Sequence, residues 1–118
     1  SSRWADWENN ELLPPQHNMA MHLIRLPENQ RDPKVLAAAC AKFDRAIQIM
    51  EEQLGRTRYI AADRFTYGDI PLGVRIHRWH VLGLAKQTPP NIARWYAEIQ
   101  ARPGFQRYTA EPSYHLEG

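Results

Sequence analysis

The sequence has a single cysteine, Cys40, so no disulfide can form within the chain. It has no apolar run near the roughly 20 residues that a membrane span requires, and no charged-then-apolar signal segment opens it. It also lacks a large excess of one charge, because 15 basic and 13 acidic residues are interspersed and give a formal net charge of +2. These absences predict a cytoplasmic protein in a reducing compartment, with neither a membrane nor nucleic acid as its partner.

The length of 118 residues is that of one domain, which can bury roughly two-thirds of the surface that the unfolded chain exposes. No stretch of useful length alternates apolar and polar residues with the period of a β-strand, whereas several follow the helical period. We therefore expect residues 1–118 to form a single all-α domain, a compact bundle of four main helices and a short fifth. The start at Ser1, without an initiating Met, suggests an excised piece or a cloning remnant.

The first predicted helix runs from Trp4 to about Leu26, where apolar residues recur at helical spacing. Pro14 and Pro15 interrupt it, and a proline inside a helix removes a hydrogen bond at a cost of about 3 kcal/mol. We expect this helix to bend or break near the two prolines.

The second predicted helix begins at Asp32 and Pro33, because Asp is a good N-cap and Pro suits the first helical position. Its apolar residues keep to steps of three and four up to Leu54. Gly55 is expected to end it as the C′ residue.

The second half of the chain predicts three more helical segments, over residues 67–82, 91–101 and 105–108. The first of them is apolar on most of its circumference, which is typical of a central helix, and Gly83 is expected to close it. Pro71 is expected to remove one early hydrogen bond from this helix and to kink it slightly. The tail after Thr109 is expected to be loosely held.

This central helix has the most strongly specified start in the chain, within Phe65-Thr66-Tyr67-Gly68-Asp69-Ile70. Thr66 is predicted as the N-cap, with Asp69 three residues later in a capping box. In such a box the Thr66 hydroxyl accepts from the N–H of Asp69, and the Asp69 carboxylate accepts from the N–H of Thr66. Phe65 and Ile70 hold the positions of a hydrophobic staple, so we assign all four residues to structure.

Two histidine pairs, His77 with His80 and His17 with His22, raise the question of a metal site, because imidazoles one turn apart can share an ion. No carboxylate lies at a matching spacing, so we predict structural or partly exposed histidines and no metal. Cys40 lies in an alanine-rich run, where packing is expected rather than a nucleophilic thiol.

Several segments, taken in order, resemble one known family. They are Trp4-Ala5-Asp6-Trp7, Arg31-Asp32-Pro33, Tyr59-Ile60-Ala61-Ala62-Asp63-Arg64-Phe65-Thr66-Tyr67-Gly68-Asp69-Ile70, and Trp95-Tyr96 with Arg102-Pro103-Gly104-Phe105. In combination they cover about residues 4–108 and look like the C-terminal helical domain of a cytosolic glutathione transferase, of the bacterial kind similar to the theta class.

The resemblance implies that these residues are one part of an enzyme. In the family a thioredoxin-like domain precedes the helical one, binds glutathione and supplies the catalytic residue. None of that domain is found in this sequence, so no catalytic residue and no cofactor is assigned here, and glutathione is expected as the co-substrate of the full-length enzyme. The helical domain contributes one wall of the hydrophobic co-substrate site and, through its first two helices, part of a homodimer interface.

The resemblance places the co-substrate wall for a hydrophobic electrophile on the first helix before its break. The residues expected to bind this substrate, three or four apart on one face, are Trp7, Asn10, Glu11, Pro14 and His17. Packing in the core is an equally good interpretation of Trp7.

Two other functions stay open at this point. The first is a non-catalytic helical module of the same fold for protein association, as in certain translation factors and synthetases, because a fold does not settle function. The second, ranked lower for lack of ligands at bundle spacing, is a small metal-binding helical bundle.

Overall fold

The computed structural model describes residues 3–109, in which every regular element is a helix. In chain order these are α1 (Arg3–Glu11), α2 (Leu13–Ala20), a π-helical turn η1 (Met21–Arg25), a 3-10 turn η2 (Glu28–Gln30), α3 (Pro33–Arg56), α4 (Asp69–Val81), α5 (Pro90–Gln100) and α6 (Pro103–Thr109). The all-α fold expected from the sequence is confirmed. The tail expected to be loosely held lies outside the described residues.

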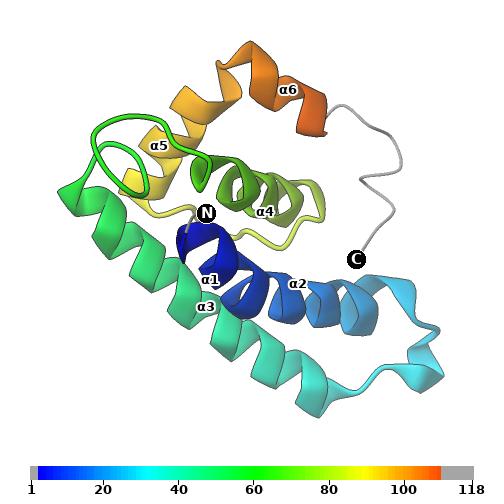
Figure 1. The fold of residues 1–118 in the computed structure, drawn as a ribbon. Coiled ribbons are helices and arrows are strands. Elements are labelled where there is room, and N and C mark those ends of the chain that lie inside the picture. Colours follow the sequence, from blue (N-terminus) through cyan, green and yellow to red (C-terminus); the bar gives the residue numbers. More distant parts are fainter. Residues whose placement is uncertain (1–2, 110–118) are drawn as a thin grey trace.

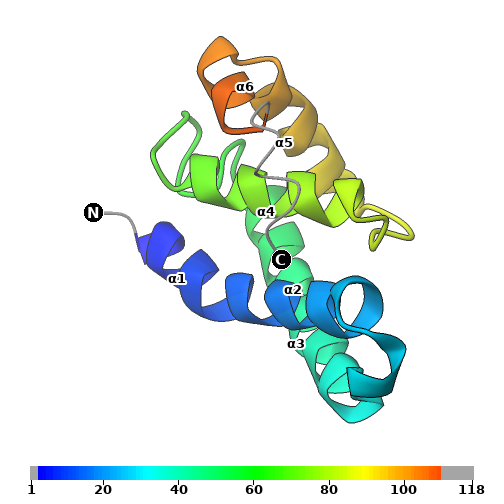
Figure 2. The ribbon, with the colours of Figure 1, turned by 90° about the vertical axis from the view of Figure 1, so that its right-hand side faces the viewer.

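The central helix is α4, which contacts α1 and α2 on one side and α5 and α6 on the other (Figure 1). Figure 2, turned by 90°, shows the same order of helices from the side. The segment between α3 and α4, residues 57–68, is called the connector. The largest fully buried apolar side chains of the core come from the break between α1 and α2, from α3, from the connector, from α4 and from α5, and they are Leu12, Phe43, Met50, Leu54, Ile60, Leu72, Ile76, Ile92, Trp95 and Ile99. Among residues 3–109 no helix is both long and apolar enough to cross a bilayer.

The break in the first helix falls at Leu12, just before the two prolines. Pro14 and Pro15 lie in the first turn of α2, where a missing N–H costs little because first-turn N–H groups have no acceptor within their own helix. The backbone nevertheless stays helical through the break, because Leu12 N–H donates to Glu8 O (3.0 Å) and Gln16 N–H donates to Leu12 O (3.0 Å). The sequence therefore located this bend correctly to within a few residues.

The start of α3 follows the prediction and its end does not. The Asp32 carboxylate caps the helix by accepting from the N–H groups of Lys34 (2.9 Å) and Val35 (3.4 Å). The expectation that Gly55 ends the helix is wrong, since α3 continues to Arg56. The role of Gly55 is close approach, because a Cβ there would lie 3.1 Å from Nδ2 of Asn91 in α5.

The start of α4 also differs from the expected capping box. Thr66 N–H does donate to Asp69 Oδ2 (2.8 Å), but the Thr66 hydroxyl does not accept from the N–H of Asp69. Instead that hydroxyl donates to Oδ2 (3.3 Å), and the N–H of Asp69 donates to the backbone carbonyl of Thr66 (3.1 Å). The helix begins at Asp69, so Pro71 lies in its first turn and removes no helical bond, contrary to the expected kink.

The reason for this departure is that Asp69 is fully buried and bonds to distant segments. Its Oδ1 accepts from the backbone N–H of Ile60 in the connector (2.8 Å) and from the indole Nε1–H of Trp95 in α5 (2.8 Å). Because a buried carboxylate is stable only when its oxygens are hydrogen-bonded, these donors draw the side chain inward. Asp69 therefore joins the connector, the start of α4 and the middle of α5.

Other helix ends are also closed by side chains from a distance. The Glu51 carboxylate of α3 accepts from the N–H groups of Asn91 (3.0 Å) and Ile92 (2.9 Å), which caps the start of α5. Arg94 of α5 in turn donates to the carbonyl of Leu54 near the end of α3 (2.9 Å). The predicted stop at Gly83 is confirmed, since this residue has φ of +72° just after α4.

Replacing Asp69 should unfold the protein more readily than replacing its partner Thr66. Asp69→Ala leaves two buried N–H groups, on Ile60 and Trp95, without an acceptor, and we expect it to cost roughly 3–5 kcal/mol. Thr66→Ala keeps the backbone N–H bond to Asp69, so about 1 kcal/mol or less is expected. Urea unfolding followed by circular dichroism measures both, and equal losses would contradict the central role given to Asp69.

A matched pair of glycines tests the packing of α6 on α4. A Cβ on Gly73 would lie 2.8 Å from Cε1 of Phe105 and 3.0 Å from Cγ2 of Ile99, whereas a Cβ on Gly104 would meet nothing within 4 Å. We expect Gly73→Ala to destabilise by about 1–3 kcal/mol through overpacking. Gly104→Ala should be neutral or stabilise by up to about 1 kcal/mol, because alanine favours the helix. Thermal unfolding distinguishes the two, and a neutral Gly73→Ala would refute the close contact.

Candidate functional site

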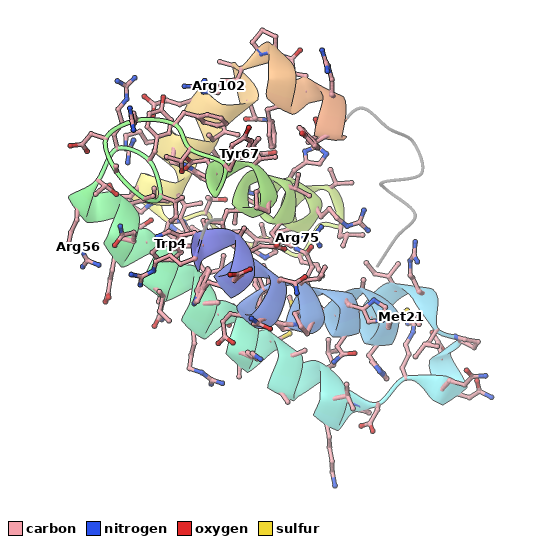
Figure 3. All side chains as sticks on the ribbon, viewed as in Figure 1. Trp4, Met21, Arg56, Tyr67, Arg75 and Arg102 are labelled. Carbon is pink, nitrogen blue, oxygen red and sulfur yellow. The ribbon has the colours of Figure 1, made fainter. Side chains whose placement is uncertain are left out.

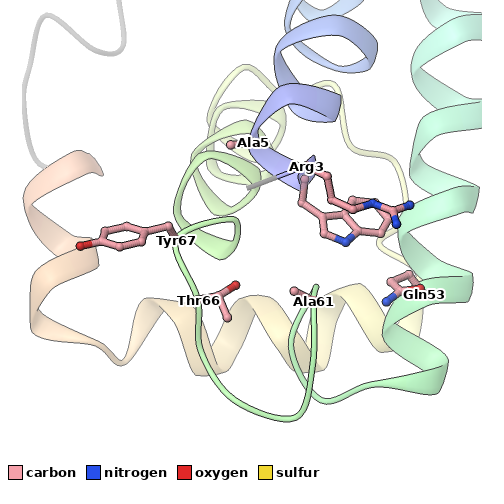
Figure 4. A pocket seen from close by; sticks show the side chains of 7 residues that line it. Arg3, Ala5, Gln53, Ala61, Thr66 and Tyr67 are labelled. Carbon is pink, nitrogen blue, oxygen red and sulfur yellow. The ribbon is translucent and has the colours of Figure 1, made fainter. Parts of the chain in front are cut away.

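A groove of about 740 Å³ lies where the start of α1 meets the end of α3 and the connector to α4 (Figure 4). We call it the α1 groove, and its lining residues are Arg3, Trp4, Ala5, Gln53, Ala61, Thr66 and Tyr67. Its volume is in the range of small-molecule sites. The lining is mainly apolar with a few polar groups, so the groove can remove part of an apolar molecule from water.

Each wall of the α1 groove is held by an identifiable contact. Gln53 of α3 donates from Nε2 to the carbonyl of Ile60 (2.9 Å), which fixes the connector against α3. The Trp4 ring packs edge to face on Trp7, with ring centroids 5.2 Å apart. The connector side is set by Asp69, through its bonds to Thr66 and Ile60. The connector side of the groove thus depends on the buried carboxylate.

The chemistry available in the α1 groove is binding and orientation. Arg3 is the one formally charged residue of its lining, and its guanidinium lies 5.7 Å from the centroid of the Trp4 ring. The Thr66 hydroxyl is directed to the Asp69 carboxylate. Tyr67 is 85% exposed, and its ring points away from the other lining side chains (Figure 4).

None of the five residues expected to bind a co-substrate lines the α1 groove. Trp7 is half-buried against the core, and Glu11 forms an ion pair with Lys42 of α3 (3.9 Å). Asn10 is exposed and donates from Nδ2 to the carbonyl of Asp6 (2.9 Å). Pro14 and His17 are exposed, and Pro14 lines a cavity of about 300 Å³ between α2 and α3.

A buried polar cluster that the sequence did not reveal joins the first two helices to α4. Arg75 forms an ion pair from Nε to Glu8 Oε2 (3.0 Å) and donates from Nη1 to Gln16 Oε1 (2.8 Å). Gln16 returns a bond from Nε2 to the carbonyl of Arg75 (2.8 Å). Burial raises the pKa of the Glu8 carboxyl, and the charge of Arg75 offsets part of that rise. Figure 3 shows Arg75 where α4 faces the α1–α2 pair.

The histidines of the predicted pairs contact other kinds of residue. His77 Nδ1 lies 3.1 Å from the hydroxyl of Tyr96, and His80 Nε2 lies 2.7 Å from that of Thr88. His22 accepts from the backbone N–H of Asp32 (2.9 Å). Burial lowers the pKa of His80 and raises the pKa of Tyr96. In residues 3–109 no three His, Cys, Asp or Glu side chains gather as a metal ion would require.

The single cysteine is half-buried on α3. Burial, with a smaller contribution from Asp44, raises the pKa of the Cys40 thiol. A nucleophilic cysteine needs the opposite shift, so this environment suits packing.

The residues that sequence reasoning missed come together only in the tertiary structure. Gln53 and Ala61 line the α1 groove, but the sequence around them shows only an ordinary helix and an ordinary connector. Glu8 and Arg75 belong to helices far apart in the chain. One signal was available, since Arg75 stands among apolar neighbours on a helix predicted to be central. A charged residue in such a position needs a buried partner.

Comparison with known proteins finds relatives over almost the whole chain. Glutathione S-transferase GstB of Escherichia coli is 28% identical over 112 residues, which cover 95% of this chain and 54% of that protein. Glutathione S-transferase F11 of Arabidopsis thaliana is 26% identical over 118 residues, which cover 95% of this chain and 55% of that protein. The chain thus spans about half the length of the curated relatives that it matches.

Solved structures and family models lead to the same group. The theta class glutathione S-transferase from the citrus canker pathogen Xanthomonas axonopodis pv. citri superimposes with a TM-score of 0.82 at 29% identity, over 92% of this chain and 57% of that one. That protein was also solved with glutathione bound. The family model "Glutathione S-transferase, C-terminal domain" matches residues 33–98, which is more than half of the chain. The chain therefore belongs to the family of glutathione S-transferase C-terminal domains.

Proposed function

We propose that this chain is the carboxyl-terminal, co-substrate-side domain of a cytoplasmic glutathione transferase. In this proposal a thioredoxin-like domain precedes it in the whole protein and binds glutathione. That domain favours the thiolate of glutathione, whose sulfur attacks an electrophilic carbon of an apolar substrate. A C–S bond forms, and a leaving group departs with the electron pair of its bond to that carbon. The residues of this chain supply orientation and removal of water, which lower the barrier without forming a bond to the substrate.

The observation that carries this proposal is the similarity to the Xanthomonas enzyme. Its 29% identity extends over 92% of the present chain, and that enzyme binds glutathione in its crystal. The superposition covers 92% of this chain, which is more than the segment of residues 33–98 matched by the family model. The relatives named above are all glutathione S-transferases, which favours an enzyme over a module for protein association.

The proposed wall consists of Trp7, Asn10, Glu11, Pro14 and His17. Asn10, Pro14 and His17 are exposed, as residues that meet a substrate must be before it binds. The α1 groove extends the wall toward the start of α1, because Trp4 lines the groove and packs on Trp7. An apolar substrate would rest on this surface.

A second copy of the chain is the other proposed partner. The first two predicted helices, which are α1–α2 and α3 in the structure, would provide part of the interface. Two features of α3 suit such a contact: Ile49 is 46% exposed, and the small residues Ala37, Ala38 and Ala41 are also exposed. Small side chains let a second helix approach closely.

The complete natural protein that contains this chain should conjugate glutathione to a standard aromatic electrophile. We expect a rise in thioether absorbance that depends on both substrates, and heat of glutathione binding in calorimetry. If the complete protein neither binds glutathione nor conjugates it, the proposed enzyme function is contradicted and a module for protein association is favoured.

A pair of adjacent asparagines tests where the co-substrate wall lies. Asn9 and Asn10 are both exposed on α1, and only Asn10 belongs to the proposed wall. We expect Asn10→Ala to raise KM for the electrophile about threefold to tenfold, the net value of one hydrogen bond, with kcat little changed. Asn9→Ala is the control and should leave KM unchanged. Equal effects of the two variants on KM would show that the co-substrate wall does not lie on this face of α1.

A further inference from the structure

The joint between α1 and α2 is a weak point of the backbone. Pro14 and Pro15 have no N–H, so neither can donate to the carbonyl four residues earlier, as a residue of a continuous helix does. Those carbonyls belong to Asn10 and Glu11, which are members of the proposed co-substrate wall. Two backbone bonds, from Leu12 N–H to Glu8 O and from Gln16 N–H to Leu12 O, cross the break, and the angle between α1 and α2 depends on these together with support from outside the backbone.

The polar cluster described above spans this joint on its buried side. Glu8 lies one turn before the break at Leu12, and Gln16 lies one turn after it. Arg75 of α4 contacts both, at 3.0 Å from Glu8 and 2.8 Å from Gln16. The carbonyl of Arg75 also accepts from Gln16 (2.8 Å), so α2 is tied to α4 by two bonds at once.

The cluster is better suited to fixing an angle than to adding stability. Its three residues are at most 8% exposed, and charges taken that far out of water recover little net free energy from their attraction. The raised pKa of Glu8 agrees with this, because burial outweighs the attraction of Arg75. Hydrogen bonds, unlike apolar contacts, depend on direction, so the cluster restricts how α1 and α2 are oriented on α4.

We propose that Arg75 is a positioning residue, which sets the angle between α1 and α2 by holding Glu8 and Gln16 on opposite sides of the proline joint. The angle itself follows from the structure alone. Its effect on catalysis rests on the proposed function, because the co-substrate wall crosses this joint. If the angle between α1 and α2 varied, the co-substrate wall would bind its substrate less well, whereas the binding of glutathione would not change.

The first test measures the angle and needs no activity. In the full protein carrying Cys40→Ala and no other accessible cysteine, spin labels on Asn9→Cys of α1 and Arg45→Cys of α3 report the distance between exposed positions. Because α2 packs on α3, this distance follows the orientation of α1 relative to α2. We expect one narrow distribution in the parent and a broader or shifted one in Glu8→Leu/Arg75→Met, which removes both charges together. An unchanged distribution overturns the proposal.

Two further variants separate positioning from folding. Gln16→Leu removes only the α2 side of the cluster and strands no charge, so it serves if the double variant does not fold. Pro15→Ala restores one backbone donor at the joint, so added to Glu8→Leu/Arg75→Met it should narrow the distribution again. A merely structural role predicts no such rescue. Failure of the rescue, with the distribution as broad as before, would show that the joint is not what Arg75 supports.

The second test connects the angle to the reaction. In the same protein, Glu8→Leu/Arg75→Met should raise KM for the electrophile roughly tenfold while KM for glutathione stays within about twofold, because only the wall moves. The single variant Glu8→Gln keeps an oxygen acceptor for Arg75, so its KM for the electrophile should stay much closer to that of the parent protein. A changed distance with an unchanged KM would overturn the link to the wall. A parent protein without conjugation would reject the proposed function, and the distance measurement would still decide the role of Arg75.

Discussion

The fully buried carboxylate of Asp69 is the interaction on which much of the structure depends. Its two oxygens receive the backbone N–H of Thr66, the backbone N–H of Ile60 and the indole N–H of Trp95. A buried carboxylate without these donors would be very unfavourable, so its presence requires that all three segments meet at one place. The connector, the first turn of α4 and the middle of α5 therefore take their positions together, and one side of the α1 groove is formed at the same time.

The same principle recurs at the ends of α3 and α5. Glu51 of α3 closes the start of α5, and Arg94 of α5 closes the end of α3. Each helix thus satisfies the free backbone groups of the other, which local caps would otherwise have to do. Gly55 allows this arrangement, because a side chain at that position would press on Asn91. A glycine that resembles a helix stop in the sequence is here a point of contact between helices.

Local signals in the sequence were enough to predict the fold, but they were not enough to predict the candidate site. The cap at Asp32, the stop at Gly83 and the bend near Pro14 depend on residues within one turn of each other, so they can be read from a single chain. The orientation of Asp69 could not be predicted, because its other donors come from segments that no local pattern connects. Arg75 and Gln16 are 59 residues apart, and only the finished packing makes them neighbours.

The central helix carries polar side chains that orient the elements on both of its sides. Asp69 faces the connector and α5, whereas Arg75 faces α1 and α2. Apolar burial makes these helices associate but tolerates sliding and rotation, because it depends on area and has no direction. Directional bonds at two points of one rigid helix remove that freedom. The α1 groove and the proposed co-substrate wall share α1, and their remaining residues lie on different elements. Both are positioned from α4, so a change in the orientation of that helix would move them together.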